Sequence, residues 1–108
     1  MALTTNTVSQ RGSVGNLAIG QVVTDSGTAA ITTFTVGFKP RHVKFVNLTD
    51  RIVDEWYEGM AADSSLHTVA AGTITLVTSG GITVGANSFT VPAALIPASK
   101  TLTYQVSG

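Results

Sequence analysis

Cysteine is absent from the 108-residue chain, and charged residues are scarce. Without cysteine there can be no disulfide, no thiolate nucleophile and no cysteine-bound zinc, and a small secreted disulfide scaffold is not expected. Charged side chains are 11% of the residues, against roughly 25% in ordinary soluble domains. The net charge is zero, which gives no general attraction to DNA, RNA or an anionic membrane. Such a surface favours self-association, so we expect a chain that packs against other protein; a simple monomer with a threonine-rich surface is the alternative.

Long hydrophobic runs are also absent. No stretch approaches the roughly 20 apolar residues of a membrane span, and the first residues lack the basic start and apolar segment of a signal peptide. Asn47-Leu48-Thr49 matches the glycosylation sequon, which we interpret as a chance match. The apolar fraction of 44% is enough for the core of a single domain.

Catalytic groups are few. The only histidines are His42, within a basic cluster, and His67, which has no carboxylate near it in sequence; a catalytic triad is therefore not expected. The acidic residues match no calcium-loop pattern, and we interpret them as a solvated, salt-bridged face: Asp50, Asp54, Glu55, Glu58 and Asp63. The glycine-rich segment 79–85 lacks the Lys-Ser/Thr of a phosphate loop. We expect no enzyme activity, no cofactor and no metal.

Period-2 patterns and turn residues predict an all-β chain. Residues 1–16 are polar and are expected to form a flexible N-terminal arm, either a disordered terminus or a segment that orders on a neighbouring subunit. Residues 17–108 are expected to form one antiparallel β-sandwich or jelly-roll-like domain. Its expected strands are 17–24, 28–37, 42–48, 73–78, 82–84, 88–91 and 100–107. The first two are expected to form a hairpin around Asp25-Ser26-Gly27. We expect a loop at residues 61–72, with a brief extended piece at 66–69, and a turn at residues 79–81.

Residues 51–60 fit two patterns. Their apolar residues fall at helical spacing, yet the flanking β-rich segments and the turn-like residues 47–50 favour a strand that continues a hairpin. We predict the strand. In it, Trp56 shares one face with Ile52, Asp54 and Glu58, while Tyr57 lies on the other face with Val53 and Glu55.

The segment 34–60 holds the single tryptophan and most of the charge. It should nucleate the core, since aromatic side chains bury the most apolar area. Lys39, Arg41 and Lys44 form a small basic patch interleaved with phenylalanines, but the acidic run that follows argues against nucleic-acid binding. The opposite clusters suit ion pairs, across the hairpin or between copies.

Segment 34–60 (FTVGFKPRHVKFVNLTDRIVDEWYEGM) and the tail GGITVGANSFTVP…KTLTYQVSG resemble small virion structural proteins of tailed bacteriophages, of the head decoration (cement) type. The likeness covers residues 28–108. It implies a non-enzymatic β-sandwich that oligomerises, commonly as a trimer, and binds the outside of the head at junctions between major capsid proteins. The expected location is the phage head surface, and the host cytoplasm before assembly, with no nucleic-acid or membrane partner.

Under this interpretation, Arg41, Trp56, Glu58 and Lys39 are the candidate contacts with other subunits or the capsid, because arginine and tryptophan most often dominate interfaces. The alternative for Trp56 is a plain core residue. A competing hypothesis is a β-sandwich module of a phage tail or baseplate that binds carbohydrate or protein; Trp56 with Tyr57 would be its only aromatic pair for a sugar. The third hypothesis is that the protein is an enzyme.

Overall fold

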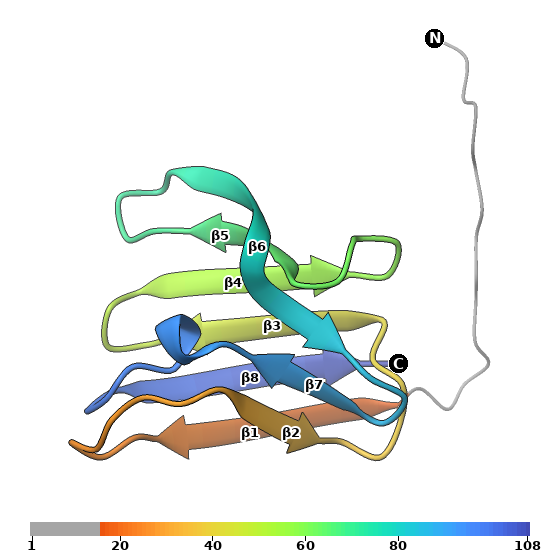
Figure 1. The fold of residues 1–108 in the computed structure, drawn as a ribbon, viewed down its shortest axis with the longest axis horizontal. Helices are drawn as coiled ribbons and strands as arrows, with labels where there is room; N and C mark the ends of the chain where they lie inside the picture. Colours follow the sequence, from red (N-terminus) through yellow and green to blue (C-terminus); the bar gives the residue numbers. More distant parts are fainter. Residues whose placement is uncertain (1–15) are drawn as a thin grey trace, which may run out of the picture.

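The computed structural model describes residues 16–108, and these residues form eight antiparallel strands and one 3₁₀ turn (Figure 1). The predicted arm lies outside the described residues except for Asn16. The strands join in one curled sheet with the order β1-β8-β3-β4-β5-β6-β7-β2. Their bounds are β1 Leu17–Val23, β2 Thr32–Thr35, β3 His42–Asn47, β4 Ile52–Tyr57, β5 Ser64–Thr68, β6 Ile74–Val84, β7 Ser88–Val91 and β8 Thr101–Ser107, with η1 at Ala93–Leu95. The expected all-β class is confirmed, and no helix among the described residues is long and apolar enough to cross a membrane.

The curl of the sheet comes from β6. Its first half pairs with β5 and its end pairs with β7, so β7 and β2 lie over the part of the sheet that contains β8 and β1 (Figure 1). Ring contacts join the two parts: Phe34 of β2 lies 6.0 Å from Phe45 of β3 and 5.2 Å from Tyr104 of β8, between ring centroids. The face of the sheet that they cover is the concave face.

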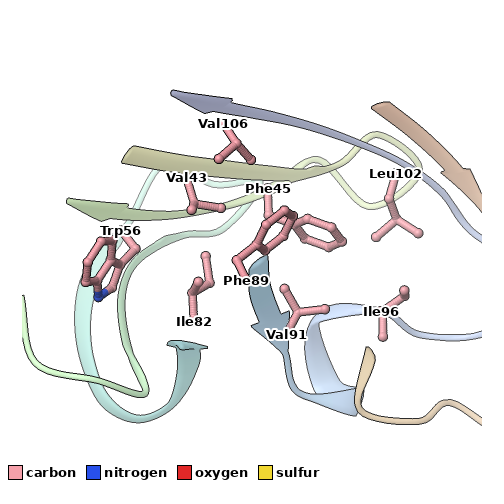
Figure 2. Packing of buried hydrophobic residues seen from close by; sticks show 9 residues of the cluster. All are labelled: Val43, Phe45, Trp56, Ile82, Phe89, Val91, Ile96, Leu102 and Val106. Carbon is pink, nitrogen blue, oxygen red and sulfur yellow. The ribbon is translucent and has the colours of Figure 1, made fainter. Parts of the chain in front are cut away.

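The hydrophobic core fills this concave face (Figure 2). Strands β3 and β8 alternate buried and partly exposed residues, as strands with one covered face do. Val43 and Phe45 point inward from β3, and each large side chain contributes about 1.5–3 kcal/mol when buried. The core comprises Val43, Phe45, Trp56, Ile82, Phe89, Val91, Ile96, Leu102 and Val106.

The predicted hairpin between 17–24 and 28–37 is wrong. β1 pairs with β8 and β2 pairs with β7, which places the two strands at opposite ends of the sheet order. The end of β1 is held instead by the segment before β8: the Thr24 N–H donates to the Lys100 carbonyl at 2.9 Å, and the Ser99 N–H donates to the Asp25 carbonyl at 2.8 Å. These bonds prevent Asp25 from turning the chain back along β1.

Two further expectations fail around β5 and β6. The predicted loop at 61–72 contains a full strand, β5, which the expected extended piece at 66–69 covers only in part, and the predicted turn at 79–81 lies inside β6. The pairing register shifts between Ser64 and Ser65: Ser65 lies opposite Val77 and Ser64 lies opposite Ile82, so residues 78–81 have no opposite residue on β5. At this irregularity the backbones come so close that a Cβ on Gly81 would lie 2.3 Å from the Ser64 carbonyl carbon. Glycine here permits close strand approach within a bend rather than a chain reversal.

The strand predicted at 51–60 is confirmed in β4, and the helical alternative is wrong. β4 pairs with β3 along its whole length. The connecting turn is fixed by Asn47, whose side-chain oxygen accepts the Asp50 N–H and whose amide donates to the Asp50 carboxylate, both at 3.0 Å. Arg51 takes the left-handed conformation, with φ of 58°.

Candidate interaction face

The face of the sheet opposite the core is called the convex face here. It is formed by the outward residues of β1, β8, β3, β4, β5 and the first half of β6. Tyr104, Phe45 and Asp54 lie opposite one another on β8, β3 and β4, and their side chains point to the concave face. Because side chains alternate along a strand, the residues before and after each of them point to the convex face. One row across the sheet is Ile19, Gln105, Lys44, Glu55, Leu66 and Leu76.

Several large apolar side chains are exposed on this face. Antiparallel sheets with one covered face normally present polar residues on the other, but the strands here present Leu17, Ile19, Val23, Tyr57, Ile74 and Leu76, all exposed. Among residues 16–108, only two other large apolar side chains are exposed: Leu48, directly after β3, and Ile31, before β2. Exposed apolar side chains gathered on one face are typical of a protein interaction surface.

A shallow groove follows β8 across the convex face. Its volume is about 220 Å³, and its lining includes Ile19 on one side, Lys44 and Val46 on the other, and Thr103 and Gln105 along the floor. The outward residues of β8 here are polar, while β1 contributes an apolar wall and β3 a mixed one. It can accept an apolar side chain from a partner while the floor supplies hydrogen-bonding groups.

Contacts with two neighbouring side chains hold Tyr57 in place on the convex face. Lys44 and Glu55 lie opposite each other on β3 and β4. The Tyr57 hydroxyl donates to Glu55 Oε2 at 2.6 Å, and this bond raises the pKa of Tyr57. The Tyr57 ring stacks on His42, with 4.5 Å between centroids. Held from two sides, Tyr57 loses little conformational freedom when a partner covers it.

Of the four predicted contact residues, two pair with each other. The Arg41 Nε donates to Glu58 Oε2, and the Glu58 N–H donates to the Arg41 carbonyl at 2.7 Å. The pair joins the ends of β3 and β4, so one of the two predicted arrangements, pairing across the hairpin, is present. Lys39 is exposed just before β3. These three residues lie beside the convex face rather than within it.

Trp56 belongs to the core, which was the stated alternative. Its side chain points to the concave side (Figure 2), only 7% of the residue is exposed, and its indole N–H donates to the Ala61 carbonyl at 3.2 Å. Tyr57 points to the convex side. The two aromatic rings therefore do not form a common platform.

The sequence patterns did not predict a buried polar cluster on the concave side of the sheet. Asp54 was expected on a solvated face, but the residue is only 3% exposed. Its Oδ1 accepts the Ser65 hydroxyl at 2.9 Å and lies 2.8 Å from His67 Nδ1. The signal was in the alternation of β4, which places Asp54 on the same side as Trp56. His67 could not be assigned to Asp54, since the pairing of β5 with β4 was not predicted.

This cluster does not have the order of a hydrolytic triad. A triad places the histidine between the serine and the carboxylate, whereas here Asp54 lies between Ser65 and His67, and Ser65 is completely buried. The described residues also contain no group of three or more histidine or acidic side chains that could hold a metal ion. The arrangement can cross-link β4 to β5 in the interior.

Comparison of the chain with protein-family models, with curated proteins and with solved structures found no match.

Proposed function

We propose that the chain is a non-enzymatic structural protein of a phage virion. It is a head decoration protein that associates with copies of itself and binds the outer surface of the capsid, stabilising the head. We also propose that the end of β6 with β7 and β2 acts as the second layer of a jelly-roll-like sandwich. The observation that carries the proposal is the convex face, where six of the eight exposed large apolar side chains lie.

The partner that suits this face is a protein surface. The charged side chains that the sheet strands present there are Lys44 and Glu55, which lie opposite each other, so the face offers no field to attract nucleic acid or anionic lipid. An apolar face with paired charges suits the major capsid protein. In a shell, the same contact is repeated many times, so a contact of ordinary strength is enough for stable coating.

Arg41, Glu58 and Lys39 suit the rim of this contact. The Arg41–Glu58 pair lies beside Tyr57 at one end of the face, and both side chains reach solvent. Exposed pairs contribute only about 0–1 kcal/mol, but they fix orientation. Trp56 supports the face from beneath as a core residue.

A carbohydrate-binding module of a tail or baseplate is less well supported. Its expected sugar platform was Trp56 with Tyr57, and these rings point to opposite sides of β4. No other observation favours this function.

Two matched isoleucines provide the test. Ile74 on the convex face is 66% exposed, and Ile31 off that face is 71% exposed. Capsids of the parent phage that lack this protein are mixed with wild-type, Ile74→Asp or Ile31→Asp protein and sedimented. We expect Ile74→Asp to bind roughly tenfold to a hundredfold more weakly, since burying an isoleucine contributes about 1.5–3 kcal/mol.

Ile31→Asp is expected to bind like the wild type, and circular dichroism checks that both variants are folded. Failure of the wild-type protein to bind capsids would contradict the proposed function. Equal binding by Ile74→Asp and the wild type would exclude the convex face as the docking surface.

A further inference from the structure

The free edge of β1 is a second surface that the proposed function does not use. β1 ends the sheet and pairs only with β8 among the described strands. Natural edge strands are usually short or interrupted by proline, lysine or a bulge, because an open edge pairs with other chains. β1 has the sequence LAIGQVV over seven residues, with no charge and no proline. At the other end of the sheet, β2 has only four residues.

The hydrogen-bond pattern shows which groups of β1 are free. Beyond the two ends of the strand, the Gly108 N–H donates to the Asn16 carbonyl and the Thr24 N–H donates to the Lys100 carbonyl, both at 2.9 Å. Even-numbered residues therefore direct their backbone groups to β8. Because the direction alternates in an antiparallel ladder, the N–H and C=O groups of Leu17, Ile19, Gln21 and Val23 point away from β8, to the open edge.

We propose that this edge pairs with β1 of a second copy of the chain, antiparallel and about a two-fold axis at Gly20. In this register, Leu17 lies opposite Val23 and Ile19 lies opposite Gln21. Four N–H groups from each copy then donate to carbonyls of the other. Two-fold contacts are self-complementary, and this register aligns all seven residues of both strands.

The side chains of β1 fit this partner. Leu17, Ile19 and Val23 are exposed on the convex side, and the register places Leu17 of each copy against Val23 of the other, an apolar pair at both ends. No like charges meet, because β1 carries none. The pairing joins the two convex faces in one wider apolar surface. It predicts a dimer in place of the trimer that the sequence resemblance implies.

A proline substitution at the edge provides the first test. Ile19→Pro removes an N–H that points to the open edge and leaves the β8 ladder intact, since edge strands tolerate proline there. Ile19→Ala keeps the N–H, and Thr33→Pro places a proline on the outer edge of β2. Masses are measured by light scattering and sedimentation. We expect dimers for the wild type, Ile19→Ala and Thr33→Pro, and a dimer dissociation constant raised roughly tenfold or more for Ile19→Pro.

Cysteine pairs test the register without relying on proline. The chain has no cysteine, so introduced thiols are the only ones. Opposed residues have Cα atoms about 5.5 Å apart, within disulfide range, whereas Ile19 and its own copy would be about 8–9 Å apart. A mixture of Ile19→Cys and Gln21→Cys proteins should form the mixed disulfide in preference to either homodisulfide, as read by mass spectrometry. Leu76→Cys is the control for random collision.

The outcomes are separable from those of the capsid experiment. A wild-type monomer or trimer, a dimer that Ile19→Pro leaves intact, or homodisulfides as abundant as the mixed one would overturn the two-fold pairing. Ile74→Asp, distant from β1 in the sheet order, is expected to remain a dimer. Absence of capsid binding by a wild-type protein that still forms the dimer therefore counts against the proposed function alone.

Discussion

Asp54 is the only buried ionisable residue among residues 16–108. Its contribution to the free energy of unfolding depends on its hydrogen-bond partners. Asp54→Ala would leave the Ser65 hydroxyl, which is completely buried, without an acceptor. An unsatisfied buried donor costs about 1–3 kcal/mol, so we expect at least this loss in the free energy of unfolding, measured in urea. Asp54→Ala combined with Ser65→Ala should recover part of it.

The control for this cycle is Glu58→Gln. It breaks the exposed pair with Arg41 and should change the free energy of unfolding by less than about 1 kcal/mol. If Asp54→Ala were as mild as Glu58→Gln, the buried cluster would not be a structural cross-link.

The hydrogen bond of Tyr57 makes the stability of the fold depend on pH at alkaline pH. The hydrogen bond to Glu55 raises its pKa above the ordinary value of 10.0, so folding favours the neutral phenol. This stabilisation is fully present below pH 10 and is lost as the pH rises through the higher pKa of the folded state. We expect Glu55→Gln to lower the pKa of Tyr57, measured by tyrosinate absorbance in a Tyr104→Phe background. An unchanged midpoint would contradict the role of Glu55.

Among the elements, β6 depends on Gly81 for its close approach to β5. In Gly81→Ala the new methyl group would meet the Ser64 backbone, which cannot move without disrupting the β5–β6 ladder. Overpacking of this kind costs about 1–3 kcal/mol. Gly85→Ala is the matched control, because its methyl group would meet the Ser88 hydroxyl oxygen at 3.0 Å, an atom that can rotate away, and the Ser88 carbonyl oxygen at an ordinary contact distance of 3.6 Å. Thermal unfolding should separate the two variants, and equal midpoints would contradict the close approach at Gly81.

The strands that the sequence predicts well are those whose alternation is regular and whose turns carry their own signals. β3 and β4 are joined by Asn47 to Arg51, and β8 alternates Leu102, Tyr104 and Val106 inward. Local patterns cannot show which strand pairs with which when the partners are distant in sequence. The β1–β8 pairing, and with it the open edge, was therefore unpredictable, as was the meeting of Asp54 with His67.

In the molecule as a whole, the curled sheet separates two surfaces of different character. The concave side uses aromatic side chains from β2, β3, β7 and β8 to form the core. The convex side has no covering layer among the described residues, yet it exposes six large apolar side chains. A chain of this size gains nothing in its own stability from such a face, so its apolar character is best explained by association.

Salt dependence follows from the same charge distribution. The net charge is zero, β1 carries no charge, and Lys44 and Glu55 compensate each other on the convex face. Sodium chloride should therefore change the dimer and capsid dissociation constants by about fivefold at most, since an exposed pair contributes about 0–1 kcal/mol. Sulfate should strengthen both contacts, because it favours apolar burial. Sedimentation across both salts measures this. Release of the protein from capsids by sodium chloride would instead assign the contact to Arg41, Glu58 and Lys39 at the rim.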